Sequence, residues 1–367
     1  MYKLIRFKTT RATRVGAAAV TVAAVVAGAA GIAAGQGNAA PAKDRFNAPT
    51  LENGVLTIKG TNKADAIALG QSAVQRGVLQ VDVGDDGTAD FEFNTADLTQ
   101  IIVKAGNGDD TVRIDESNGS FSNLIPTTLE GGNGDDTLTG GSGAVTLHGG
   151  NGNDKLIGEN GDETLFGDNG NDVIDGNKGA DRMVGGNGDD TLVWDPGDGS
   201  DVVEGQDGFD TMVFNGAGGA ETFDLNAIGH RLTFTREPGD ITMDTNGVEQ
   251  IDVNALGGAD VVTVNDLSGT DVTKVNVDLA GALGGTAGDG AADSVVVGGT
   301  KGDDTIDVSG DAAGVNVTGL ATKVNVSHAE PANDSLDIET NGGADIINHA
   351  GLAAGVIQFF VDGILIP

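Results

Sequence analysis

The chain has 367 residues but only 12 Phe, one Trp and one Tyr, which excludes a large core packed with aromatic rings. Its 55 acidic and 20 basic residues give a formal net charge of -35, so no nucleic acid or anionic membrane is expected as a partner, since both are polyanions. The absence of cysteine excludes disulfides and thiolate metal sites, and the excess of carboxylates favours bound cations instead.

Residues 1–42 are predicted to be a cleavable secretory signal peptide. A basic segment precedes an apolar run from Val15 to Ala34, and Ala40-Pro41-Ala42 offers a small-residue cleavage site. The alternative is a retained membrane anchor, but a run this rich in Ala and Gly is weakly hydrophobic. No later segment is apolar enough to span a bilayer. We therefore expect a mature chain without a membrane span, secreted from the cell or associated with its surface.

Residues 43–127 are predicted to form an N-terminal β-rich flank, because apolar and polar residues alternate between Gly and Asp clusters. Asp65 and Asp110 lie 45 residues apart in related contexts, which indicates a solenoid rung of that length. Residues Asp82 to Gly87 (DVGDDG) faintly match a calcium loop of the EF-hand type. The twelfth position of that loop is Phe93 instead of Glu, so a plain surface turn is favoured.

Residues 128–215 contain consecutive nine-residue units of the form GGxGxDxUx, where U is apolar. Seven units run in register from Gly131, and a further one follows a two-residue insertion at Trp194 and Asp195 and an irregular unit from Pro196. Six residues of each unit suit a tight turn, and the remaining three suit a short strand. Two units then make one coil of 18 residues, so turns 18 residues apart stack and their aspartates face a common gap.

Residues 216–367 are predicted to form a C-terminal β-rich, solenoid-like region. Segments such as QIDVNALGGADVVTVND from Gln250 repeat the strand-and-turn pattern with looser spacing. Asp260 and Asp304 lie 44 residues apart and suggest another large rung. Residues 280–292 look like a flexible loop. No segment after residue 42 has a sustained helical period, so the predicted fold class is all-β.

The stacked turns offer only oxygen ligands. Carboxylates and carbonyl oxygens that converge without nitrogen or sulfur suit Ca²⁺, which accepts six to eight oxygens in flexible geometry, whereas zinc prefers His or Cys. The predicted cofactor is therefore Ca²⁺. At about ten times its dissociation constant, each ion stabilises the folded chain by roughly 1.4 kcal/mol. A roll with roughly five such ions is expected to depend on them for folding.

These units resemble the RTX, or haemolysin-type, calcium-binding repeats of secreted bacterial proteins. The resemblance implies a right-handed parallel β-roll, or β-solenoid, that binds Ca²⁺ through the aspartate at the sixth position and turn carbonyls. On one side of the roll, the implied ligands are Asp136, Asp154, Asp172, Asp190 and Asp210. On the other side, the sixth positions are Val145, which cannot ligate, followed by Glu163, Asp181 and Asp201. Asp110 is an outlying candidate.

The flanks resemble those of secreted Gram-positive calcium-binding proteins that carry an N-terminal signal. The predicted function is a calcium-binding repeat protein that folds on Ca²⁺ and serves as an extracellular structural or adhesive surface, with an unspecified extracellular or cell-wall partner. The alternative is an exoenzyme whose roll assists secretion and folding. We favour the first, without enzymatic activity or catalytic residues, because the four histidines are dispersed and no segment carries a catalytic motif.

Overall fold

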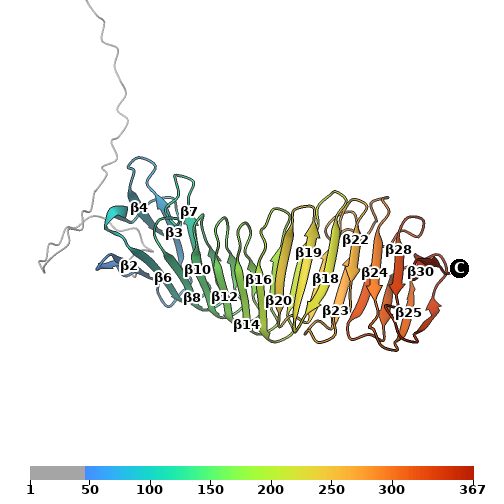
Figure 1. Cartoon of the computed structure of the whole chain (residues 1–367). Helices are drawn as coiled ribbons and strands as arrows, with labels where there is room; N and C mark the ends of the chain where they lie inside the picture. The colour runs from blue at the N-terminus through green and yellow to red at the C-terminus, as the bar shows by residue number, and fades with distance from the viewer. Residues whose placement is uncertain (1–45) are drawn as a thin grey trace, which may run out of the picture. The chain divides into compact units, whose positions relative to one another are not determined.

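The computed structural model describes residues 46–367, and the predicted signal peptide lies outside them. Their regular structure is β-strand apart from one short 3-10 helix, η1 (Thr95–Asp97). The strands form two sheets, of 16 and 15 strands, which stack along one direction (Figure 1). Within these residues, no helix is long and apolar enough to cross a membrane. The expected all-β solenoid with little helix is confirmed.

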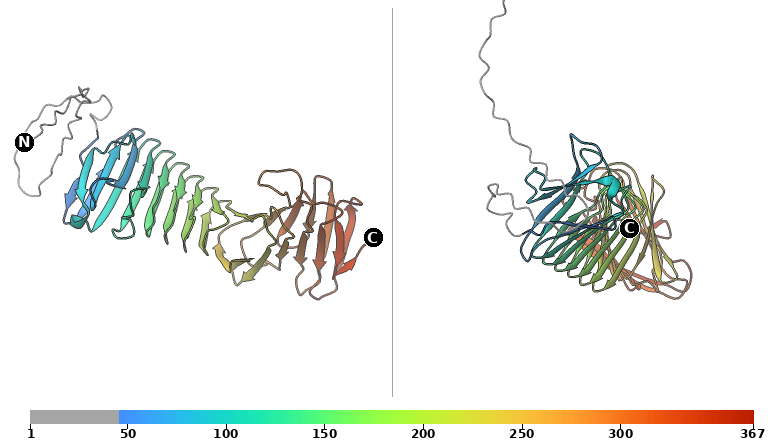
Figure 2. Two further views of the ribbon diagram at one scale, coloured as in Figure 1. Left: turned by 90° about the horizontal axis from the view of Figure 1, so that it is seen from above. Right: turned by 90° about the vertical axis from the view of Figure 1, so that its left-hand side faces the viewer.

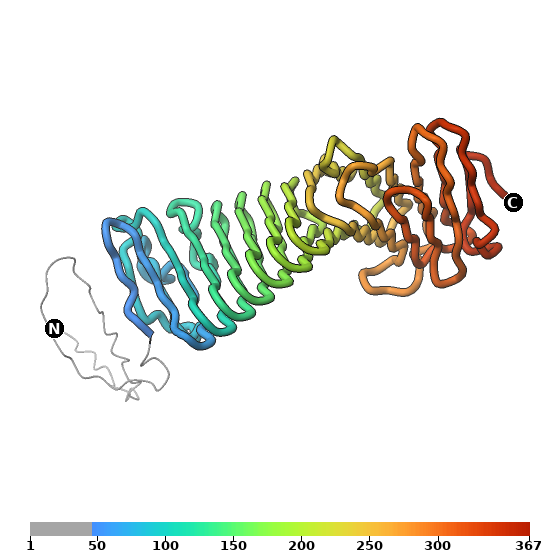
Figure 3. The backbone as a smooth tube through the Cα atoms, turned by 90° about the horizontal axis from the view of Figure 1, so that it is seen from below, coloured from blue at the N-terminus to red at the C-terminus, as the bar shows by residue number. Residues whose placement is uncertain are grey.

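The central part is a parallel β-roll in which the chain alternates between the two sheets. Its strands are β8 (Thr127–Asn133), β9 (Thr137–Thr139), β10 (Val145–Asn151), β11 (Lys155–Ile157), β12 (Thr164–Asn169), β13 (Val173–Asp175), β14 (Arg182–Asn187), β15 (Thr191–Trp194), β16 (Val202–Asp207) and β17 (Thr211–Asn215). Even-numbered strands lie in the 16-stranded sheet and odd-numbered strands in the other. Leu147 pairs with Leu165, and Leu165 with Met183, so equivalent residues of successive coils are in register. The green coils of Figure 3 follow this regular path.

The apolar eighth position of each unit forms the core between the two sheets. Leu138, Leu156 and Leu192 from one sheet, and Leu147 and Leu165 from the other, have no exposed surface. Side chains alternate across a strand, so the neighbours of each buried residue point to solvent. The view along the stack in Figure 2 shows the two layers that enclose this narrow interior.

The N-terminal flank extends both sheets and adds an antiparallel end to each. Its strands are β1 (Thr50–Glu52), β2 (Val55–Lys59), β3 (Ala66–Gln71), β4 (Val78–Val83), β5 (Phe91–Asn94), β6 (Gln100–Asn107) and β7 (Thr111–Asp115). β2 and β6 continue the parallel order of one sheet into β8, and β3 and β7 that of the other into β9. β4 and β5 fold back antiparallel against β3, and β1 pairs antiparallel with β2.

The C-terminal region continues both sheets through longer coils. Its strands are β18 (Thr222–Ile228), β19 (Arg231–Glu237), β20 (Ile241–Asn246), β21 (Gln250–Asn254), β22 (Val261–Val264), β23 (Lys274–Asp278), β24 (Ser294–Gly298), β25 (Thr305–Asp311), β26 (Gly314–Thr318), β27 (Lys323–Ser327), β28 (Ser335–Glu339), β29 (Ile346–Leu352), β30 (Gln358–Val361) and β31 (Ile364–Leu365). Two antiparallel meanders, β18–β20 and β25–β27, interrupt the parallel order. Larger loops accompany them in the yellow and orange part of Figure 3.

A cluster of aromatic rings lies where the roll meets the C-terminal region. Trp194 extends β15 by one residue and pairs with Phe214 of β17. Their rings stack with centroids 4.0 Å apart, and the ring of Phe234 from β19 lies 4.3 Å from that of Phe214. All three are buried. The insertion that breaks the nonapeptide spacing therefore places the single tryptophan of the chain in the core.

The glycines of the turns can be tested with a matched pair. Gly150 and Gly197 both have φ of +116°, but a Cβ atom on Gly150 would collide with the Gly132 carbonyl oxygen, whereas none of the described atoms lies within 4 Å of one on Gly197. Both alanine variants should lose about 1–3 kcal/mol of unfolding free energy from backbone strain. We expect Gly150→Ala to lose about 1–3 kcal/mol more through overpacking. Urea unfolding in saturating calcium measures both, and equal losses would contradict the close stacking of the turns.

Candidate metal centre

A continuous row of carboxylates runs along the side of the solenoid where the chain passes from the 16-stranded to the 15-stranded sheet. We call it the first-side row. Each member occupies the last turn position before a strand, and its backbone N–H donates to a side-chain oxygen of the next member at 2.7 to 2.8 Å. Its members in order are Asp65, Asp110, Asp136, Asp154, Asp172, Asp190, Asp210 and Glu249. The predicted stacking of one side is thus present, and Asp110 belongs to it.

Each central carboxylate of the row keeps one oxygen without a partner. Asp136 is 1% exposed and its Oδ1 accepts the N–H of Asp110, but no donor within residues 46–367 reaches its Oδ2. The same holds for the Oδ2 atoms of Asp110, Asp154, Asp172, Asp190 and Asp210. A buried, unpaired carboxylate is costly because it has lost water without gaining a hydrogen bond or counter-ion. Such an oxygen lacks either a proton or a cation.

Carbonyl oxygens crowd the same space. A Cβ atom on Gly131 would collide with Asp136 Oδ2 and lie 2.6 Å from the carbonyl oxygen of Gly149 in the next coil. Two coils further on, a Cβ atom on Gly167 would likewise collide with Asp172 Oδ2 and would lie 2.6 Å from the carbonyl oxygen of Gly185. Within residues 46–367, no three acidic or histidine side chains converge on one point. The turns at Gly131 and Gly167 thus combine a carboxylate with a backbone carbonyl, a set of hard oxygens that fits Ca²⁺.

The opposite side of the roll carries a shorter row. Glu163 N–H donates to Asp181 Oδ1 at 2.7 Å, and Asp181 N–H donates to Asp201 Oδ1 at 2.9 Å. Glu163 Oε1 and Asp181 Oδ2 are buried without a partner in the described part of the chain. Val145 precedes this row, as the sequence predicted, and Met243 follows it, so apolar side chains close both ends.

Comparison with protein families identifies the repeat. The family model of the RTX calcium-binding nonapeptide repeat matches residues 130–162, 157–192 and 196–225. These segments are RTX calcium-binding nonapeptide repeats. The match includes every predicted ligand of the roll from Asp136 to Asp210 and excludes Asp65, Asp110 and Glu249 of the first-side row. No curated protein matches the chain.

Burial raises the pKa of the carboxylates in the RTX turns. Desolvation, followed by neighbouring acidic groups, raises the pKa of Asp154 and that of Asp190 to about 7. The pKa of Asp136 and that of Asp172 rise to about 6 for the same leading cause. On the other side, desolvation and then the charge of Asp181 raise the pKa of Glu163 to about 9. Protons and cations therefore compete for these oxygens near neutral pH.

Sequence reasoning missed both ends of the first-side row. Asp65 was recognised only as a spacing partner of Asp110, and their hydrogen bond confirms that 45-residue rung. Glu249 was missed because it follows β20, where the nonapeptide spacing has ended. The Asp260–Asp304 rung was wrong: Asp260 bonds to Asp293, and Asp304 to Asp345. These aspartates precede strands of different sheets, β22 and β25, so they lie in turns of opposite sense.

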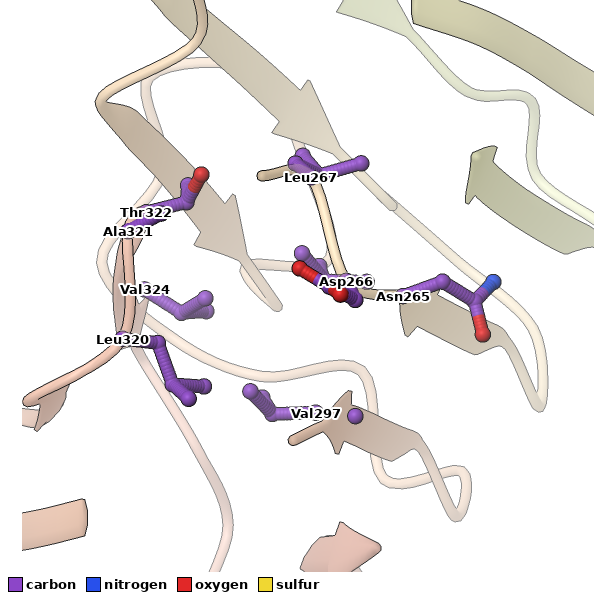
Figure 4. Close-up of a pocket in the computed structure, with 10 residues that line it drawn as sticks. Asn265, Asp266, Leu267, Val297, Leu320, Ala321, Thr322 and Val324 are labelled. Carbon is purple, nitrogen blue, oxygen red and sulfur yellow. The ribbon is translucent and has the colours of Figure 1, made fainter. Parts of the chain in front are cut away.

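Beyond Glu249, the equivalent positions of the first side carry no carboxylate. The equivalent positions before β23 and β27 are Thr273 and Thr322. A cavity of about 10 Å³, large enough for one water at most, lies beside Thr322. Its lining includes the polar Asn265 and Asp266 as well as the apolar Leu267, Val297 and Leu320 (Figure 4). The DVGDDG segment is a plain turn, as favoured, because Asp82 accepts the N–H groups of Asp86 and Gly87 within it.

The raised pKa values predict how stability depends on pH. Each folded-state pKa lies above the unfolded value near 4, so a carboxylate stabilises the metal-free fold when protonated, and that contribution is lost as pH rises to about 7. We expect the metal-free melting temperature to fall between about pH 5 and pH 7, and the increase caused by calcium to grow over the same interval. A metal-free melting temperature that rises over this interval would contradict the assignment.

Proposed function

We propose that this calcium-binding repeat protein is secreted, folds when its roll binds Ca²⁺ outside the cell, and acts as an extracellular structural or adhesive surface. The observation that carries the proposal is the set of buried, unpartnered carboxylate oxygens repeated in every coil of the RTX segment. Near neutral pH, where these carboxylates begin to lose their protons, cations are needed to neutralise the buried negative charge. Calcium at extracellular concentrations is such a cation.

The energetics of the roll support a metal-dependent fold. One coil of the roll buries the apolar eighth residue of each of its two units, such as Leu147 and Leu156, while it also buries an ionisable carboxylate. An ion at about ten times its dissociation constant contributes roughly 1.4 kcal/mol, comparable to the full burial of one such side chain. With two such side chains in each coil, the apolar stripe contributes more than the ions, but the ions also neutralise the buried carboxylates, so the roll needs both.

The burial of the aromatic cluster at the junction with the C-terminal region supports a binding or structural role without enzymatic activity. Trp194, Phe214, Phe223 and Phe234 are buried in the core, so none of them lines a groove for a substrate. The outward positions of the roll carry polar residues in regular order, as in the aligned Thr128, Thr146 and Thr164. Such a wall presents a periodic polar surface to an extracellular or cell-wall partner.

Chelation and one substitution test the calcium requirement. The far-ultraviolet circular dichroism β signal of the chain should decrease in EGTA and return with millimolar calcium. Asp172→Asn keeps the oxygen that accepts the Asp154 N–H but removes the free oxygen, so the calcium concentration at the folding midpoint should rise about tenfold. Asp224→Asn removes an outward charge from β18 and should leave the midpoint unchanged. A signal indifferent to EGTA, or equal midpoints for the two variants, defeats the proposal.

Fractionation of producing cells tests secretion and surface association. We expect the chain in the culture medium or on the cell surface, shortened at its N-terminus near residue 42. Washing with EGTA should release the surface-bound fraction, because the roll unfolds without calcium and its outer face can then no longer bind the partner. Recovery of full-length chain only from the cell interior would refute export, and surface retention in EGTA would refute calcium-dependent attachment.

A further inference from the structure

A second row of carboxylates lies in the C-terminal region. We call it the C-terminal row; it consists of Glu221, Asp260, Asp293 and Asp334, which precede β18, β22, β24 and β28. The N–H of each donates to an oxygen of the next at 2.8 to 3.0 Å, as in the RTX turns. All four side chains are buried. Only Glu221 falls inside the segments that match the RTX repeat.

Two members of the C-terminal row already have their partners. Glu221 forms an ion pair with Arg236, and its Oε2 also accepts the N–H of Ala217. Asp334 accepts the N–H of Asp293 through Oδ1 and that of Glu330 through Oδ2. Protein groups therefore satisfy both side chains, and neither requires a metal ion.

Asp260 is different. It is 1% exposed, and its Oδ1 accepts the N–H of Glu221, but no donor within residues 46–367 reaches its Oδ2. The Oδ2 atoms of the aspartates in the RTX turns are buried and unpartnered in the same way. An unpartnered oxygen at this burial lacks either a proton or a cation.

The turn that ends at Asp260 has the backbone of an RTX turn although its sequence, ALGGAD, differs. Leu256 and Gly258, the second and fourth residues, have φ of +67° and +130°. The equivalent residues of an RTX turn, Asp168 and Gly170, have φ of +73° and +134°. A leucine in this region is strained by about 1–2 kcal/mol, so the surrounding structure imposes the conformation.

Further acidic groups face this turn. Asp289 Oδ2 accepts the N–H of Gly258 at 2.6 Å, and Asp293 Oδ1 accepts the N–H of Asp260 at 2.8 Å. Burial and the charges of Asp293, Glu221 and Asp289 raise the pKa of Asp260 to about 7. In the described part of the chain, no ion pair links Asp260, Asp289 or Asp293 to a basic side chain, whereas Arg236 pairs with Glu221. Negative charge therefore accumulates here without a counter-ion.

We propose that the turn ending at Asp260 is a calcium site outside the RTX repeats, with Asp260 as its ligand and Asp289 and Asp293 supplying negative charge beside it. The available donors are oxygens, which select Ca²⁺ over zinc. The site does not depend on the RTX turns, since Asp260, Asp289 and Asp293 all lie outside the segments that match the RTX repeat. It would make the C-terminal region, like the roll, responsive to calcium.

The test counts bound calcium and follows thermal stability in the full chain. Equilibrium dialysis should find one ion fewer in Asp260→Asn than in the unsubstituted chain, and the same number in the control Asp224→Asn. The asparagine carbonyl can still accept the Glu221 N–H. The metal-free melting temperature of Asp260→Asn should therefore match or exceed that of the unsubstituted chain, while its increase on adding calcium becomes smaller.

A second variant covers the case in which Asp260→Asn fails to fold. Asp289→Asn leaves Asp260 in place and should weaken the affinity of one ion several-fold without changing the others. Unchanged calcium counts and affinities in both variants would overturn the inference. A chain that binds no calcium at all would refute the proposed function as well. If Asp172→Asn loses bound calcium while Asp260→Asn and Asp289→Asn lose none, only the site at Asp260 is refuted and the proposed function stands.

Discussion

The hydrogen bond from the backbone N–H of one acidic turn residue to the carboxylate of the next coil is the interaction on which the rest of the solenoid depends. It fixes the distance between coils through one carboxylate oxygen and leaves the second oxygen buried in the gap. Asp136, Asp154 and Asp172 repeat this arrangement with bonds of 2.7 to 2.8 Å. The bond that holds the stack together thus also creates the demand for a cation. The regular spacing of the coils and the requirement for a metal ion therefore both arise from this one hydrogen bond.

Different groups neutralise or replace the buried carboxylates in different parts of the chain. In the RTX turns, no basic side chain approaches the free oxygens of the described aspartates, so an external ion is needed. At Glu221, the guanidinium of Arg236 takes that place, and it also lies over the ring of Trp194, 5.3 Å from the ring centroid. A side-chain cation and an aromatic cluster therefore stabilise the junction with the C-terminal region where the regular repeat ends. Apolar residues such as Val145 and Met243 terminate a row without any cation.

Much of the roll could be predicted because its signal is local and strictly periodic. The nine-residue spacing specified which aspartates share a side, and the hydrogen bonds of the two rows confirm it. The flanks were predicted as β-rich, but their registers were not, because insertions change the coil length. Asp260 was matched with Asp304 on similar spacing, whereas the loop between β23 and β24 places Asp293 beside it. The aromatic cluster around Phe214 also escaped prediction, since its members are distant in sequence.

The extended rows explain why spacing alone is a poor guide outside the repeat. Successive members are 18 residues apart in most of the roll, but 45 separate Asp65 from Asp110 and 39 separate Asp210 from Glu249. Extra residues enter as antiparallel meanders within a sheet or as loops between strands, so the acid still precedes a strand. The geometric requirement is therefore an acidic residue at the end of the turn, in register with a neighbour of the same kind. Asp260 satisfies that requirement with an ALGGAD turn that lacks the first two glycines of the repeat. At this position the chemistry of the repeat is present although its sequence is not.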